Sequence, residues 1–201
     1  MSVSKSFILS SILIVCLWCT GCLSNTEVNN STVAQTPVKL ESLTIEMIDQ
    51  TPDSLLVYMI FEHISNRMAD HSDQQLASLL ALPKAQQVIY ITWTLEGEVN
   101  NGGFNQFYYN SSGQFAELAP EALKLVGATQ YAALTDAANE VYEKNKERIT
   151  KYQDGTSEGF SKSYENNPLD KFDDQFYVMK EPLMDLQVAY IRKNKKDFVD
   201  K

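Results

Sequence analysis

The sequence predicts an all-α protein with a single compact domain of about seven to nine helices over residues 40–201. Apolar residues recur three and four positions apart along most of this range, which is the helical period. Proline and glycine fall where such segments would begin and end. No stretch alternates between apolar and polar residues as a half-buried strand does, and no internal repeat is visible.

Residues 1–21 are predicted to be a lipoprotein signal peptide. Lys5 supplies a short positive region, and residues 7–18 form an apolar run that is too short to span a bilayer comfortably. Thr20-Gly21-Cys22 then places small residues before a cysteine, as in a bacterial lipobox, with Cys19 where leucine is usual. We expect Cys22 to be the lipidated N-terminus of the mature chain. An uncleaved anchor and cleavage without lipid are the alternatives.

Residues 22–39 are predicted to be a flexible linker between the lipid and the domain. Serine, asparagine, threonine, glutamine and proline dominate this segment, and its apolar residues are isolated. Cys16 and Cys19 would leave with the signal peptide, so the mature chain could form no internal disulfide. The expected location is the bacterial cell envelope, on a membrane and outside the cytoplasm.

The first part of the domain is predicted to contain three helices. One begins at Thr51-Pro52-Asp53, with Thr51 as its cap, and extends to residue 71. His63 falls on or beside its apolar face, where a histidine is more often packed and hydrogen-bonded than metal-bound. A short helix follows over residues 73–82. Residues 84–99 are apolar almost all round, which indicates a buried helix.

Further helices are expected over residues 120–126, 129–152, 169–179 and 182–194. Gly127 ends the first of them. The long helix carries acids and bases four positions apart, Glu140 with Lys144 and Glu147 with Lys151, which is typical of a solvated face. Residues 155–168 are polar and are expected to be irregular.

The stretch Glu98–Gly113 has the most unusual composition in the chain. Asn100-Asn101-Gly102-Gly103 should end the buried helix, because glycine and asparagine adopt the left-handed conformation at low steric cost. Phe104, Phe107 and Tyr108 then share one face of a second helix. We therefore expect two helices to meet at a tight corner, with at least one of its two glycines at positive φ.

This stretch resembles the C-terminal domain family named after a bacterial DNA-mimic protein, a domain of unknown function. The resemblance covers residues 53–200 and rests on the following segments: Asn101-Gly102-Gly103-Phe104, Gln106-Phe107, Asn110–Gly113, Pro120–Leu123, Val126-Gly127-Ala128, Leu169-Asp170, Phe172-Asp173, Phe176-Tyr177 and Ala189-Tyr190-Ile191. It implies an all-helical domain that binds rather than one with a known chemistry. The protein that names the family presents acidic side chains in place of DNA phosphates.

The candidate binding or structural motif comprises Trp93, Glu96, Glu98, Asn100, Asn101, Gly102, Gly103, Phe104, Asn105, Gln106, Tyr109 and Asn110. We expect its polar groups first to satisfy the backbone at the corner, and only second to form a ligand pocket. Gly97 inside a helix costs about 1 kcal/mol relative to alanine, so a close approach by a helix or by the Trp93 ring is expected there. An enzyme that uses Glu96 or Glu98 as a base is the alternative, although the two point to roughly opposite sides.

Catalytic signatures are absent from the sequence: it has no phosphate-binding loop, no zinc-protease or serine-hydrolase motif and no paired-cysteine metal site. We therefore predict a binding module rather than an enzyme, with no cofactor and no metal. The partner is expected to be a protein, with a second copy of the chain as one candidate.

The net charge of −9 argues against direct binding of nucleic acid and permits basic partners. Loss of residues 1–21 would remove only Lys5, leaving 16 bases against 26 acids, a charge of −10. An acidic DNA-mimic inhibitor is the second alternative function. Four bases cluster near the end of the chain at Arg192, Lys193, Lys195 and Lys196. They are expected to cap the last helix, with contact to anionic lipid as the alternative.

Overall fold

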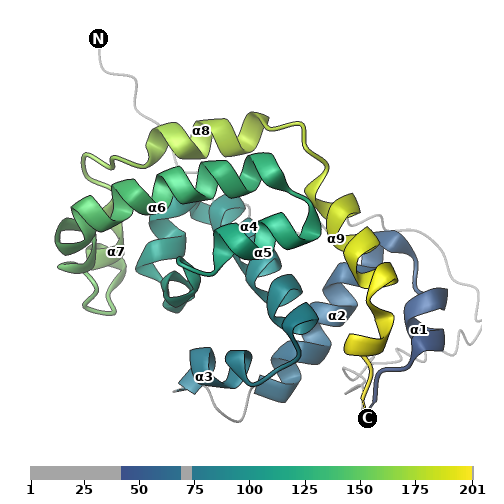
Figure 1. Cartoon of the computed structure of the whole chain (residues 1–201). Coiled ribbons are helices and arrows are strands. Elements are labelled where there is room, and N and C mark those ends of the chain that lie inside the picture. The colour runs from purple at the N-terminus through teal and green to yellow at the C-terminus, as the bar shows by residue number, and fades with distance from the viewer. Residues whose placement is uncertain (1–41, 69–73, 201) are drawn as a thin grey trace, which may run out of the picture. The chain divides into compact units, whose positions relative to one another are not determined.

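The structure of the chain is a computed structural model, which describes residues 42–68 and 74–200. Within them the chain forms nine α-helices and two short 3₁₀ helices and no strand, which confirms the predicted all-α class (Figure 1). The predicted signal peptide, Cys22 and the linker lie outside the described residues. No helix in the described ranges has the length and apolar character needed to cross a bilayer.

The helices, in chain order, are α1 (Ile45–Gln50), α2 (Asp53–Met68), α3 (Gln75–Leu80), α4 (Lys84–Tyr109), η2 (Ser111–Phe115), α5 (Ala119–Val126), α6 (Thr129–Thr150), α7 (Ser157–Ser163), α8 (Asp170–Val178), α9 (Leu183–Lys193) and η3 (Lys195–Asp197). The longest is α4, and it packs against α2, α5, α6, α7, α8 and α9. Its nearly continuous apolar sequence is therefore explained by neighbours on all sides.

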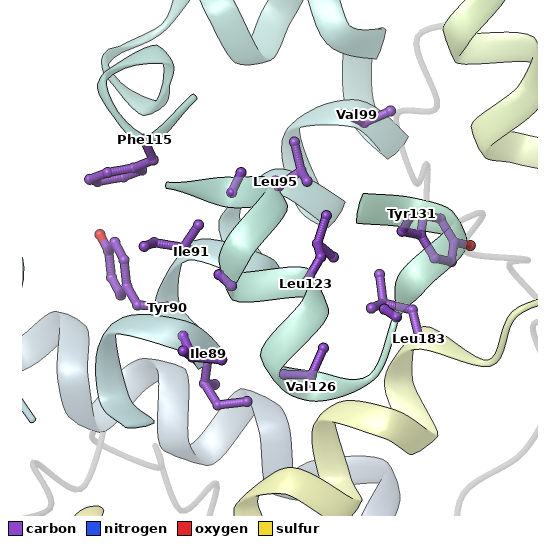
Figure 2. Packing of buried hydrophobic residues seen from close by; sticks show 14 of the residues in the cluster. Ile89, Tyr90, Ile91, Leu95, Val99, Phe115, Leu123, Val126, Tyr131 and Leu183 are labelled. Carbon is purple, nitrogen blue, oxygen red and sulfur yellow. The ribbon is translucent and has the colours of Figure 1, made fainter. Parts of the chain in front are cut away.

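The core is built on α4 (Figure 2). Leu95 and Val99 of α4 lie in one apolar cluster with Leu123 of α5, and all three side chains are fully buried. Tyr131 of α6 and Leu183 of α9 border the same cluster. Each aliphatic side chain buried in this way contributes about 1.5–3 kcal/mol, so α4 is held mainly by packing.

Two short helices were missed by the sequence prediction. α1 was not expected, and α7 falls in the segment expected to be irregular. Both begin at a threonine that caps them: the Thr44 and Thr156 hydroxyls accept hydrogen bonds from Met47 N–H and Gly159 N–H, at 3.2 and 2.9 Å. Helices of six or seven residues lack the length for a periodic signal, and tertiary contacts hold them.

The predicted start of α2 is correct in position but wrong in its cap. The Thr51 hydroxyl donates to Met47 O at 2.7 Å, so it ends α1 instead of starting α2. His63 is buried, as expected, with 5 % of its surface exposed. Its Nε2 forms no hydrogen bond with a described residue, although Asp200 Oδ1 lies 3.5 Å away.

The basic residues near the chain end do not simply cap α9, which corrects the sequence expectation. Arg192 instead donates to the carbonyl of Thr51 at 2.7 Å and to the carboxylate of Asp53 at 2.6 Å. Lys195 forms an ion pair with Asp49 of α1. These contacts fasten the end of the chain to α1 and to the start of α2.

Candidate functional site

The predicted glycine corner divides α4 into two helical parts. Gly102 has φ −154° and ψ 23°, and Gly103 has φ 74° and ψ −178°. The Gly103 conformation is essentially restricted to glycine, because a Cβ would clash with the backbone. The structure therefore confirms both the corner and the expected positive φ.

Both glycines also allow a close approach by distant side chains. A Cβ at Gly103 would lie 2.2 Å from Oδ2 of Asp173, and one at Gly102 would lie 2.8 Å from the hydroxyl of Tyr164. Asp173 belongs to α8, and Tyr164 ends α7. The corner is thus a contact point between α4 and the C-terminal third of the domain.

Asp173 satisfies the first free amide of the second helical part. The Phe104 N–H donates to Asp173 Oδ1 at 2.7 Å. Burial raises the pKa of the Asp173 carboxyl, the Phe104 hydrogen bond lowers it and the nearby charges of Asp170 and Asp174 raise it, with a net pKa of about 6. A carboxylate at this position also interacts favourably with a helix N-terminus.

Two tyrosine hydroxyls donate hydrogen bonds to backbone carbonyls that have lost their helical partners at the break. The Tyr164 hydroxyl donates to Gly102 O at 2.7 Å, and the Tyr177 hydroxyl donates to Val99 O at 2.8 Å. Nearby asparagines and Tyr109 were expected to do this, and that expectation is wrong, because the donors come from the end of α7 and from α8. The segment Phe176-Tyr177 belonged to the family motif, but nothing local linked it to the corner.

The Glu98 carboxylate is the centre of a second polar network, which links the two helical parts of α4. It accepts hydrogen bonds from Gln106 Nε2 at 2.7 Å, from Asn110 Nδ2 at 2.9 Å and from Ser112 Oγ at 2.9 Å. Asn101 Nδ2 in turn donates to Gln106 Oε1 at 3.1 Å. Four of the predicted motif residues therefore meet, and they satisfy one another.

Asn105 and Tyr109 point away from this network and tie the short part of α4 to the region of α7. Asn105 Nδ2 donates to Ser163 Oγ at 2.7 Å, and the Tyr109 hydroxyl donates to Tyr152 O at 2.6 Å. Phe104 is fully buried and packs edge-on against Phe172 and Phe176 of α8. These three members of the motif are structural in the described chain.

Trp93, Glu96 and Asn100 are not brought into the network. Trp93 is half-buried beside Phe61, with 6.0 Å between ring centroids, and Asn100 is exposed. Glu96 accepts from Gln187 Nε2 at 3.3 Å, and burial raises its pKa while this hydrogen bond lowers it. The expectation of a close approach at Gly97 is wrong: apart from its chain neighbours and the adjacent backbone of α4, no atom lies within 4 Å of where its Cβ would be.

Comparison with known proteins assigns the chain to a family. A family model described as DMP19-like protein matches residues 80–194, more than half of the chain. The chain belongs to the DMP19-like family. DMP stands for DNA-mimic protein, so the match confirms the resemblance seen in the sequence. No curated protein sequence matches the chain.

The part that matches the DMP19-like family runs from the end of α3 through α9, and it therefore contains the corner together with Asp173, Tyr164 and Tyr177. The α1 helix and the whole of α2 precede it. The contacts that hold the break in α4 thus lie entirely inside the family domain.

An open groove of about 780 Å³ runs between α5 and α6 of the DMP19-like domain, and it contains none of the corner residues. Five acids and two lysines are among its lining residues: Glu117, Glu121, Asp136, Glu140, Glu143, Lys124 and Lys144. The predicted pair of Glu140 with Lys144 is present at 3.9 Å. The second predicted pair is not formed, because Lys151 lies over the Tyr152 ring instead. Among the described residues, no cluster of His, Cys, Asp and Glu could hold a metal ion.

Proposed function

We propose that this DMP19-like protein is a lipid-anchored interaction module of the bacterial cell envelope that binds a protein partner and performs no chemistry of its own. The family gives a DNA-mimic-type domain of unknown function. The anchor and the envelope location are additions that the sequence supports, and the binding role is an addition that the geometry supports.

The assignment as a binding module, and not an enzyme, rests on the hydrogen bonds of Glu98. Its carboxylate accepts three side-chain hydrogen bonds, from Gln106, Asn110 and Ser112. A general base needs a lone pair directed at a substrate, and both Glu98 oxygens already accept hydrogen bonds, two at Oε2 and one at Oε1, so three of about four acceptor sites are filled. The most distinctive motif of the chain therefore maintains the shape of α4, and recognition is left to the outer surface.

Support for the anchor comes from the sequence alone. The apolar run of residues 7–18 precedes Thr20-Gly21-Cys22, and a polar segment follows before the domain. A lipid on Cys22 would keep the domain at a membrane outside the cytoplasm. Partners met there are envelope proteins or a second copy of the chain.

The α5–α6 groove favours a second candidate function, that of an acidic inhibitor which imitates DNA. Its acids form a negative strip on one side of the domain. Two features weaken this candidate. Lys144 and Lys146 form ion pairs with Glu140 and Glu143, which interrupts the strip. A duplex carries one charge per about 1.7 Å of its axis, a regularity that such a strip lacks.

Crosslinking and mass spectrometry in intact cells would test the proposal, with the wild-type chain compared with Cys22→Ser. We expect fatty-acid labelling of the wild type only, and envelope proteins as the main crosslinked partners. A DNA-binding regulator as the main partner, released as salt rises, would favour mimicry instead. Labelling that survives Cys22→Ser would exclude the anchor on this residue.

A further inference from the structure

A second groove, beside the last helical turn of the described chain, is lined mainly by basic residues. It occupies about 570 Å³ beside α1 and η3. Its lining residues are Ile45, Arg192, Lys193, Asn194, Lys195, Lys196 and Asp197. Four bases and one acid thus line this groove, in a protein whose net charge is −9. Figure 1 shows α1, the end of α9 and the C terminus together, well separated from α7.

The four bases fall into two pairs with different roles. Arg192 and Lys195 are engaged by Asp53 and Asp49, and this pair holds the end of the chain in place. Lys193 is exposed, as is Lys196, and neither forms an ion pair with a described residue. The groove therefore presents two cations without an ion-pair partner, next to a single acid, Asp197. Ile45, 40 % exposed, adds an apolar side chain at its edge.

The first described residues of the chain are fixed at this same end. The Leu43 N–H donates to Asp200 Oδ2 at 3.0 Å, and the Asp200 N–H donates to Leu43 O at 3.4 Å. Only 20 residues separate Leu43 from Cys22 along the chain, reading 23 to 42. A polar linker of that length has a root-mean-square span of about 25 Å. A folded domain of this size has a diameter of roughly 40 Å, so the linker favours the end that carries Leu43.

We propose that this end of the domain faces the membrane and that Lys193 and Lys196 bind the phosphate groups of anionic lipids in the bilayer that holds the anchor. This inference rests on the lipid anchor of the proposed function. The α5–α6 groove, with its excess of acids, is repelled by the same lipids and turns toward partners. The charge distribution and the anchor point then select one orientation.

The expected effect follows from the two lysines. Each lysine close to an anionic surface favours the bound orientation roughly five-fold, so the pair favours it about 25-fold. The preference should weaken as salt rises, because screening at 0.15 M acts over about 8 Å.

Energy transfer from the full lipidated protein to headgroup-labelled lipid would measure this orientation. The mature chain has no cysteine besides Cys22, so Ser42→Cys and Ser157→Cys each give a single label. Position 42 lies shortly before α1 and position 157 begins α7, and Figure 1 shows these two helices well apart. We expect strong transfer from position 42 and weak transfer from 157 in vesicles with anionic lipid. Neutral vesicles should reduce the contrast.

Charge reversal supplies the matched comparison. Lys193→Glu with Lys196→Glu should raise transfer from position 157, because the orientation is lost. Lys124→Glu with Lys144→Glu makes the same change of charge in the α5–α6 groove and should leave the contrast intact. Equal transfer from both labels in anionic vesicles, or equal effects of the two double variants, would overturn the inference alone. A Cys22 without fatty acid would overturn it together with the proposed function.

Discussion

Substituting Gly103 with alanine tests the central structural claim. Alanine at φ 74° and ψ −178° occupies a region that is almost restricted to glycine, at a cost of about 1–3 kcal/mol. Its Cβ would also lie 2.2 Å from Oδ2 of Asp173, so the carboxylate must move. The Phe104 N–H then loses its acceptor, which costs about 1–2 kcal/mol more.

Together these two costs should lower the free energy of unfolding by about 2–5 kcal/mol, which lowers the melting temperature of a domain this size by roughly 5–20 °C. Thermal and urea unfolding followed by circular dichroism would measure it. Gly97→Ala is the matched control in the same helix: Gly97 is exposed, its Cβ would meet no atom within 4 Å, and alanine should stabilise the helix by about 0.5–1 kcal/mol.

The two substitutions must therefore shift stability in opposite directions. A Gly103→Ala protein as stable as the wild type would refute the assigned strain, and so would equal losses from both variants. Combining Gly103→Ala with Asp173→Ala separates the two terms. Removing the carboxylate relieves the clash but leaves the backbone strain, so the two losses should not be additive.

Three further outcomes are expected. The pKa of Asp173 is raised to about 6, so the folded protein holds this proton more tightly than the unfolded chain does, and stability falls as pH rises through 6. The free energy of unfolding should therefore be about 1 kcal/mol lower at pH 7 than at pH 5 in the wild type, with a smaller difference in Asp173→Asn. Tyr164→Phe and Tyr177→Phe each leave one carbonyl without its donor and should cost about 1 kcal/mol in urea unfolding, whereas the exposed Tyr58→Phe should cost nothing measurable. Glu98→Gln should lower folding stability by about 1–3 kcal/mol, because an oxygen that accepts hydrogen bonds is replaced by an NH₂ group that donates them. Partner binding should fall only as far as folding does. A fully stable variant without activity would instead favour an enzyme.

The sequence predicts α4 and its corner well because their signals are local. The apolar pattern of residues 84–99 and the pair Gly102-Gly103 lie within one short stretch, and glycine permits the positive φ that a break needs. The Glu98 network was also partly predictable, since its partners lie within 14 residues.

The groups that complete the corner could not be found in the same way. Asp173 lies 69 positions from Phe104, and Tyr177 lies 78 positions from Val99. No periodicity or capping rule connects residues so far apart, so the interaction is set by packing of α8 on α4. Gly97 is the opposite case: a helical glycine suggested a contact, but the structure leaves open space above it.

The hydrogen bond from Phe104 to Asp173 gives the domain a built-in reporter. The Phe104 amide begins a helical segment, so none of its own helix's carbonyls can protect it, and its acceptor belongs to α8. Its hydrogen exchange with solvent therefore measures how often α8 lifts away from α4, separately from global unfolding. One backbone amide could thus reveal whether binding at the surface tightens or loosens the C-terminal third of the fold.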